Sequence, residues 1–151
     1  QILNVAPDTR LVILGDGADR TDLERSIAEA GVANQVILPG VRTDVDRFYS
    51  MFDVFLMPSL YEGLPVSAVE AQAAGLPCMY SDNVPRETDI TGTGTFLSLD
   101  ADIDEWTKTL ENAFNRGRLT DNPVLLEQRG YSAKANAELL MQHYERLMES
   151  K

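Results

Sequence analysis

The feature that most constrains the fold is a strand–turn–helix segment that carries two glutamates, Glu62 and Glu70, with seven residues between them. Residues 53–57 are apolar after the first position, which is typical of a strand buried on both faces. Residues 66–74 have the pattern of a helix. Pro65 stands where a first helical residue belongs, because its missing N–H would lack a partner there anyway. The segment therefore predicts one carboxylate on a turn and one inside a helix.

This order of elements has a chemical interpretation. The free N–H groups at the start of a helix form an anion site, and Gly63 allows the backbone to approach a ligand closely. Carboxylates beside such a site cannot coordinate a phosphate, but they can accept hydrogen bonds from sugar hydroxyls. The pattern favours a nucleotide-sugar. Spacing alone leaves open that Glu62 caps the turn and that Glu70 is a solvated helix residue.

Strand and helix signals alternate along the chain. Strand patterns occur at residues 10–14, which is interpreted as a buried strand, and at 36–38, 54–57 and 77–80, with a fifth at 95–99 and helical periodicity between them. Further helices follow from about residue 101. This alternation predicts an α/β fold, a Rossmann-like parallel sheet with flanking helices, in which the first four segments are parallel strands of one sheet.

The motif residues carry a family resemblance. Residues 52–66 read FDVFLMPSLYEGLPV, and residues 70–77 read EAQAAGLP. Together they resemble the donor-binding half of retaining GT-B glycosyltransferases of group 1, and within these the bacterial exopolysaccharide, capsule and lipopolysaccharide enzymes. Residues 11–17 and 36–40 resemble two earlier strands of that domain. Residues 81–87 and Trp106 are similar to the exopolysaccharide branch. The resemblance is good up to about residue 115 and loose beyond it.

The resemblance implies retaining transfer of a hexose from a UDP- or GDP-linked sugar to a glycan or lipid-linked acceptor in cell-surface polysaccharide synthesis. It implies no cofactor besides this substrate and no bound metal. Glu62 is the expected catalytic residue, holding the transferred sugar, and Glu70 is expected to hold the ribose. The expected donor-binding residues are Gly15, Gly17, Gly40, Arg42, Gly63, Leu64, Pro65, Val66, Ser67 and Glu70. A tight strand–helix turn is the alternative role of Gly15 and Gly17, and a solvated loop charge that of Arg42.

The start of the chain departs from the resembled domain. Nothing before Pro7 matches the strand, normally central in the sheet, that ends in an arginine and is followed by a lysine gripping the donor diphosphate. We interpret residues 1–151 as a partial nucleotide-sugar-binding domain, separated from its N-terminal acceptor domain and inactive alone. The resemblance implies a cytoplasmic protein. It is compatible with peripheral association with the inner face of the membrane through that acceptor domain.

Composition narrows the classes of function. The chain has 151 residues and a formal net charge of −11, so nucleic acid and anionic lipid should be repelled. No apolar run approaches the ~20 residues that cross a bilayer. The lone cysteine, Cys78, is interpreted as a small buried core residue. With one cysteine and one histidine, His143, the sequence offers no credible structural zinc site.

Other motifs carry weaker alternatives. Gly15 and Gly17 follow a strand, but the dinucleotide fingerprint needs a third glycine where Arg20 stands, which argues against a dehydrogenase. Asp82 and Glu87 lack the third ligand that a cation site needs. A nucleotide-sugar epimerase and a non-catalytic scaffold stay open. A phosphorylase would need a pyridoxal lysine, and the lysines lie outside the motif: Lys108, Lys134 and Lys151.

Overall fold

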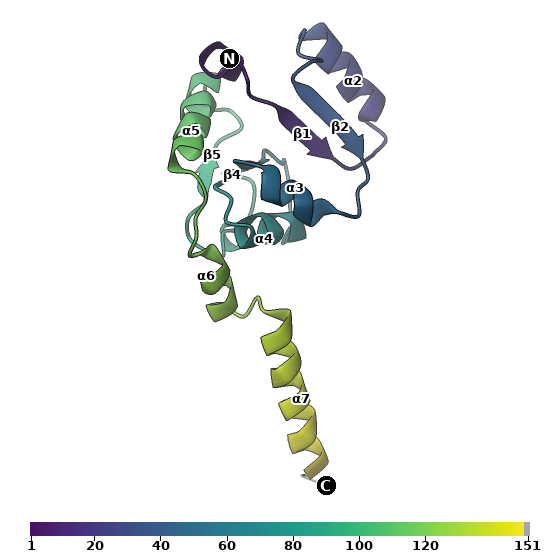
Figure 1. Ribbon diagram of the computed structural model, residues 1–151, viewed down its shortest axis with the longest axis vertical. Coiled ribbons are helices and arrows are strands. Elements are labelled where there is room, and N and C mark those ends of the chain that lie inside the picture. The colour runs from purple at the N-terminus through teal and green to yellow at the C-terminus, as the bar shows by residue number, and fades with distance from the viewer. Residues whose placement is uncertain (150–151) are drawn as a thin grey trace. The chain divides into compact units, whose positions relative to one another are not determined.

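The computed structural model describes residues 1–149 and divides them into two compact units. The first unit is Gln1–Arg47, and the second begins at Phe48. Each unit is an α/β arrangement in which strands and helices alternate along the chain (Figure 1).

The first unit is built on two parallel strands. Its elements are α1 (Ile2–Val5), β1 (Leu11–Leu14), α2 (Arg20–Glu29) and β2 (Val36–Gly40). Leu11 pairs with Val36 and Val12 with Ile37, and the register then shifts before Leu14 meets Gly40. The parallel direction follows from the helical crossover, since α2 carries the chain back to the edge where β1 began.

The second unit is built on three parallel strands in the order β3-β4-β5. Its elements are α3 (Val45–Met51, which begins in the first unit), β3 (Phe55–Met57), α4 (Val66–Ala73), β4 (Cys78–Ser81), the 3-10 turn η1 (Arg86–Thr88), β5 (Thr95–Leu97), α5 (Ile103–Arg116), α6 (Asn122–Gln128) and α7 (Ala133–Glu149). The central strand β4 is buried at all four positions.

A hydrophobic core joins this sheet to α5. Met79 of β4, Leu97 of β5 and Ala113 of α5 are buried together, and Trp106 packs against them. The indole Nε1 of Trp106 donates to the Ser98 carbonyl at 2.9 Å, so burying the ring leaves no indole N–H unpaired. The core fixes β4, whose carboxyl end faces the loop that carries Glu62.

The parallel orientation predicted for the strands is confirmed, but the single sheet is not. Among residues 1–149, β1 pairs with β2 and β3 pairs with β4, and no strand links the pairs. The resemblance implies a central strand between them. Among residues 1–149 no strand pairs with both β1 and β3, so the strands form two separate ladders.

Two further details correct the sequence interpretation. The first and third strands are not buried on both faces, since Leu11 is 45% exposed and Leu56 is 37% exposed. β1 belongs to a two-stranded sheet and β3 is an edge strand, which leaves their side chains fewer neighbours. Pro65 precedes α4 as its N-cap rather than its first residue, with φ −72° and ψ 118°. That difference of one position is within the usual fraying of helix ends.

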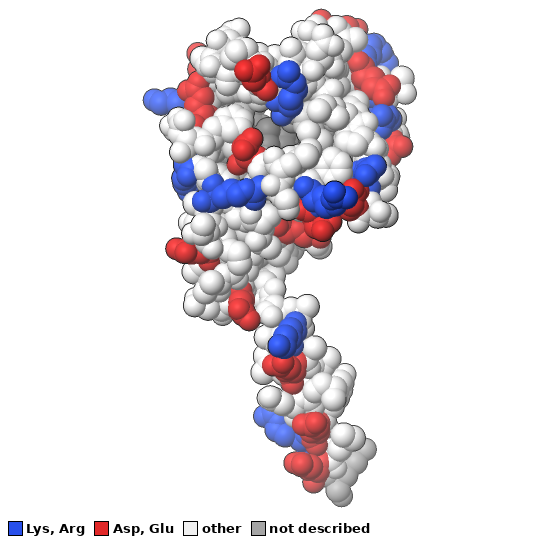
Figure 2. Space-filling model, viewed as in Figure 1, with Lys and Arg blue, Asp and Glu red and all other residues white. Residues whose placement is uncertain are grey.

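The helices expected from about residue 101 onward are present, with α5 starting at Ile103 and α7 covering Ala133–Glu149. Along α7, basic and acidic side chains follow one another on the face drawn in Figure 2. Within the described residues, no helix combines the length and apolarity needed to span a bilayer. Lys151 lies outside the described part.

Candidate functional site

The predicted turn follows β3 and leads into the open N-terminus of α4. Pro65 supplies no side-chain cap, and no other described side chain bonds the N–H groups of the first turn. These N–H groups, at Val66 and Ser67, therefore keep their capacity to donate. A Cβ on Gly63 would meet no atom within 4 Å, so the space beside the turn is open. The geometry provides donors for an anion in front of the helix.

Glu62 is held by a short hydrogen-bonded chain that ends in the sheet. Its Oε1 accepts from the Ser59 hydroxyl at 2.8 Å. The Ser59 carbonyl in turn accepts from the hydroxyl of Ser81, the fully buried last residue of β4. Among the described residues nothing donates to Glu62 Oε2, so one carboxylate oxygen is fixed and the other is available to a ligand.

Glu70 also has a defined partner. It is exposed on α4, and its Oε2 lies 3.1 Å from the Tyr49 hydroxyl. The same hydroxyl lies 3.2 Å from the Ser67 carbonyl. Tyr49 is 6% exposed. Burial, followed by the charge of Glu70 and its hydrogen bond, raises the pKa of Tyr49 well above the ordinary value, so the hydroxyl keeps its proton.

Both glutamates have a hydrogen-bond partner, and the simpler alternatives, a turn cap for Glu62 and a solvated helix position for Glu70, stay open. Glu62 accepts from a serine within its own turn, and Glu70 is hydrogen-bonded to Tyr49 as well as solvated. Tyr49 is a residue that the sequence analysis missed. It lies on the apolar stripe of α3, and the available signal was its hydroxyl, which must find a partner when the ring is buried.

Large apolar side chains surround this turn and point into solvent. The most exposed are Leu60 at 82%, Tyr61 at 85%, Leu64 at 53% and Val66 at 68%. Apolar groups gathered in the open beside polar ones are typical of a binding surface.

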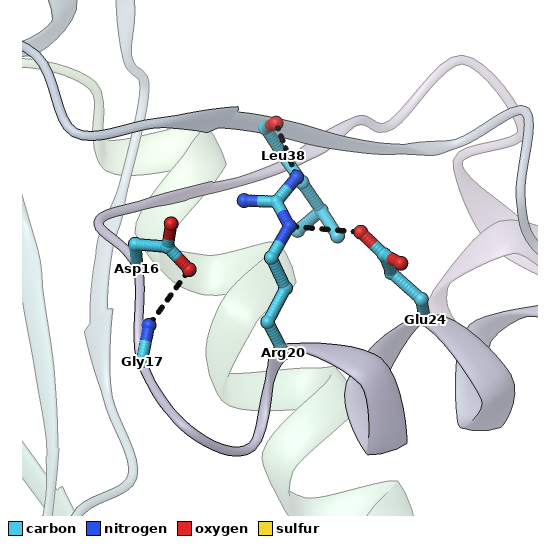
Figure 3. Close-up of polar contacts among 5 residues, drawn as sticks. All are labelled: Asp16, Gly17, Arg20, Glu24 and Leu38. Carbon is cyan, nitrogen blue, oxygen red and sulfur yellow. Dashed lines mark hydrogen bonds and ion pairs between the residues drawn. The ribbon is translucent and has the colours of Figure 1, made fainter.

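In the first unit, the loop after β1 is tied to the end of β2. The Gly15 N–H donates to the Gly40 carbonyl at 2.9 Å, and Asp16 Oδ1 accepts from the Gly17 N–H at 2.8 Å (Figure 3). Gly15 has φ 114°, a conformation that favours glycine, whereas Gly17 does not. The tight-turn role is therefore sufficient to explain Gly15 but not Gly17.

The role of Arg20 was not predicted either, since the sequence showed only that it stands where the dinucleotide fingerprint needs a glycine. Its Nη2 donates to the Leu38 carbonyl at 3.3 Å, and its Nε to Glu24 Oε1 at 2.9 Å. The third nitrogen points away from both partners, toward the side on which Asp16 lies (Figure 3). Arg20 therefore links the start of α2 to the carboxyl end of β2.

Arg42 is paired with Asp44. Its Nε and Nη2 donate to the two carboxylate oxygens at 2.9 Å each. These hydrogen bonds lower the pKa of Asp44 below its ordinary value. Arg42 is exposed, so it combines a solvated loop position with a defined orientation.

The remaining candidate residues are Cys78, His143, Asp82 and Glu87. Cys78 is buried, as predicted. His143 lies on α7 with its ring 6.3 Å from that of Tyr144. Within the described residues, no group of three or more His, Cys, Asp or Glu side chains is placed to hold a metal ion, and Asp82 and Glu87 gain no third partner.

Comparison with known proteins places these features in context. The sequence model of the family described as "Glycosyl transferases group 1" matches residues 1–147. EpsF of Bacillus subtilis, which is named as a glycosyltransferase, is 38% identical over 138 residues, covering 89% of this chain and 36% of EpsF. The "UDP-Gal:alpha-D-GlcNAc-diphosphoundecaprenol alpha-1,3-galactosyltransferase" of Escherichia coli is 35% identical over 81% of this chain and 30% of its own length. The chain thus spans about a third of these relatives.

Solved structures agree on the fold. Sucrose-phosphate synthase from Thermosynechococcus elongatus matches with a TM-score of 0.73 and 21% identity, over 99% of this chain and 41% of that one. The pneumococcal O-GlcNAc transferase GtfA, solved with UDP and GlcNAc, matches with a TM-score of 0.69 and 22% identity, over 97% and 31%.

Proposed function

Because the chain belongs to the glycosyl transferases of group 1, we propose that it is the donor half of a retaining enzyme. The enzyme transfers a hexose from a UDP- or GDP-linked sugar to a glycan or lipid-linked acceptor in cell-surface polysaccharide synthesis. Relatives named as EpsF and as a UDP-Gal-dependent galactosyltransferase acting on a diphosphoundecaprenol support this acceptor class.

One observation carries the proposal. The turn after β3 brings together Glu62, whose second oxygen is available, the uncapped start of α4, and Glu70 less than two turns into that helix. Donors for a phosphate therefore lie between two acceptors for hydroxyls. A nucleoside diphosphate sugar presents these groups in the same order: hexose hydroxyls, diphosphate, ribose hydroxyls.

The chemistry follows from where charge develops. In an oxocarbenium-like transition state the bond from the anomeric carbon to the diphosphate breaks, and the leaving oxygen gains negative charge. The N–H groups from Leu64 to Ser67 that precede or open α4 stabilise that charge, Pro65 having none to offer. Glu62 holds the hexose through its hydroxyls, and Glu70 holds the ribose. Neither role requires a covalent bond to the enzyme.

For the first unit we propose a role in binding the nucleobase. The ends of β1 and β2 carry Gly15, Gly17 and Gly40, and Arg42 follows directly. The carboxyl ends of parallel strands are the usual place for a nucleotide in open α/β sheets. The intact protein would act in the cytoplasm, at the inner face of the membrane, through contacts of its acceptor domain.

Two other functions use the same features. A nucleotide-sugar epimerase would bind the same donor but release a free or isomerised sugar, and a scaffold would bind no nucleotide. The positions of Lys108 and Lys134, outside the motif, disfavour a phosphorylase. Product identification with a nucleotide-sugar therefore separates the transferase from the epimerase, and nucleotide binding separates both from a scaffold.

The test is steady-state kinetics of Glu62→Gln and Glu70→Gln in the full-length protein. Losing a charged hydrogen bond costs ~1.5–3 kcal/mol, about one to two powers of ten. Glu62→Gln is expected to lower kcat, since this carboxylate contacts the reacting sugar. Glu70→Gln is expected mainly to raise the donor KM. Glu138→Gln, an exposed change on α7, is the matched control. Intact turnover in Glu62→Gln with none in Glu70→Gln would reverse the roles, and no effect in either would refute the site.

We further propose that residues 1–151 alone do not transfer sugar. An acceptor held in the correct orientation supplies ~7–11 kcal/mol of the barrier in well-oriented reactions, and that contribution belongs to the acceptor domain. Turnover by the purified chain at a rate similar to that of the full-length protein would contradict this proposal.

A further inference from the structure

A tyrosine outside the motif contacts Glu70, and an arginine contacts the ends of the two helices involved. Tyr49 comes from α3, and its hydroxyl reaches two points of α4, Glu70 Oε2 at 3.1 Å and the Ser67 carbonyl at 3.2 Å. An exposed glutamate on a helix otherwise samples several rotamers. A hydrogen bond from a buried, immobile donor selects one of them.

The tyrosine ring is fixed by its surroundings. Its centroid lies 6.4 Å from that of Phe52 in an edge-to-face arrangement and 6.4 Å from that of Phe55. Such aromatic contacts in a buried site leave the hydroxyl one direction in which to point. A tyrosine hydroxyl is protonated at physiological pH, and burial raises the pKa of Tyr49 further, so the group is a donor.

Arg118 is hydrogen-bonded to the ends of the two helices that make this contact. Its Nη2 lies 2.8 Å from the Tyr49 carbonyl, 2.7 Å from that of Ser50 and 2.8 Å from that of Phe52, all at the C-terminal end of α3. Its Nη1 donates to the Ala74 carbonyl, at the end of α4, at 2.6 Å.

One guanidinium therefore joins two helix C-termini, whose partial negative charges favour a cation. The planar guanidinium offers five donors in a fixed geometry, which suits carbonyls on two helix ends better than the three donors of a flexible lysine. The spacing between α3 and α4 decides whether the Tyr49 hydroxyl reaches Glu70.

We propose that Tyr49 and Arg118 are positioning residues for the donor: Arg118 sets α3 against α4, and Tyr49 then holds the Glu70 carboxylate in the orientation that binds the ribose. The inference rests on the proposed function, in which Glu70 contacts the ribose. Neither positioning residue touches the donor.

The test measures discrimination between ribose and deoxyribose. Binding of UDP or GDP, whichever binds the full-length protein, is compared by calorimetry with binding of its 2′-deoxy and 3′-deoxy analogues. The ratio of the dissociation constants is the readout. A charged hydrogen bond to a ribose hydroxyl predicts a ratio of about 10 to 100 in the unchanged protein. Glu70→Gln should bring the ratio close to 1.

Tyr49→Phe keeps the buried ring and removes the hydroxyl. We expect the ratio to fall below about 3 while affinity for the deoxynucleotide stays unchanged, a pattern that general loss of structure would not give. Tyr144→Phe, on exposed α7, is the control and should keep the full ratio. A ratio that survives in Tyr49→Phe but not in Glu70→Gln overturns the inference and leaves the proposed function intact. A ratio near 1 in the unchanged protein overturns both this inference and the ribose role proposed for Glu70.

Arg118→Met provides a second path if Tyr49→Phe fails to fold. The ratio of the dissociation constants should fall in Arg118→Met as in Tyr49→Phe. Arg129→Met, an exposed change between α6 and α7, should keep the full ratio. Full discrimination in Arg118→Met would remove Arg118 from the proposal and, without a folded Tyr49 variant, overturn it.

Discussion

Gly75 and Leu119 meet backbone to backbone, since the Leu119 N–H donates to the Gly75 carbonyl at 2.8 Å. A Cβ on Gly75 would lie 2.8 Å from the Leu119 carbonyl oxygen. This contact fastens the loop between α5 and α6 to the end of α4. It brings Arg118, the adjacent residue, to the C-termini of α3 and α4.

Gly75→Ala is therefore expected to destabilise the second unit. Its φ of 75° costs a residue with a side chain ~1–2 kcal/mol, and the backbone clash adds to this. We predict a loss of about 2–4 kcal/mol in urea unfolding followed by the fluorescence of Trp106. Gly130→Ala separates the two effects, because Gly130 has φ 86° but open space around it. Equal losses in both variants would mean that the contact with Leu119 contributes nothing.

We also expect a large loss of stability when the buried Gln72 is replaced. It is 1% exposed, its Nε2 donates to the carbonyls of Ala68 and Thr88, and its Oε1 accepts from the N–H of Thr91. Gln72→Leu keeps the volume but leaves buried groups unpaired, at ~1–3 kcal/mol each. We expect at least about 2 kcal/mol of destabilisation by the same measurement. Gln142→Leu, exposed on α7, should change stability by less than ~0.5 kcal/mol.

Cys78 should be inert in the folded protein. Burial raises the pKa of its thiol to about 12, so the nucleophilic thiolate is scarce at neutral pH. As the sole cysteine, it is the only site that iodoacetamide labels by thiol chemistry. Labelling at pH 8 should be slow in buffer and fast in urea. Rapid labelling without urea would show that the thiol is accessible and its pKa ordinary.

The same shift makes stability depend on pH. The folded state holds the thiol proton more tightly than the unfolded chain, whose pKa is near 9.0. This contribution is complete below pH 9 and is lost as pH rises toward 12. Tyr49 and Tyr80, whose pKa values are also raised, act in the same direction at higher pH. Cys78→Ala should therefore show a smaller loss of stability between pH 8.5 and about 9.5.

Arg20→Met should destabilise the first unit slightly. It removes a hydrogen bond to the Leu38 carbonyl and an ion pair with Glu24. Because the side chain is 35% exposed, we expect only about 1 kcal/mol of destabilisation, seen in thermal unfolding by circular dichroism. Arg25→Met, which breaks the exposed pair with Asp22, should cost less. A larger loss in Arg25→Met would show that the link to β2 is unimportant.

Local patterns were sufficient to predict the elements and the motif. The apolar run before Glu62 and the helix-ending signal after Ala74 predicted the bounds of β3 and α4 to within two residues. The alternation of strands and helices along the chain predicted the parallel direction of the strands. Contacts between distant segments were not predictable. Arg118 donates to backbone carbonyls 66 to 69 positions away along the chain. Every residue has a backbone carbonyl, so the sequence does not show which of them accepts this hydrogen bond. The division into two sheets was likewise not predictable, because alternating strand and helix patterns do not show which strands pair.

The burial of β4 has a consequence for local opening. Its residues, from Cys78 to Ser81, are covered on both faces and paired along both edges. Solvent deuterium can reach such amides only when the second unit opens as a whole, whereas within residues 1–149 β3 and β5 each have one unpaired edge. The amides of β4 should therefore exchange last in that unit, at a rate that reports its global unfolding. Since Ser81 ends this strand and anchors the Ser59 loop, the loop that carries Glu62 is attached to the segment that opens least often.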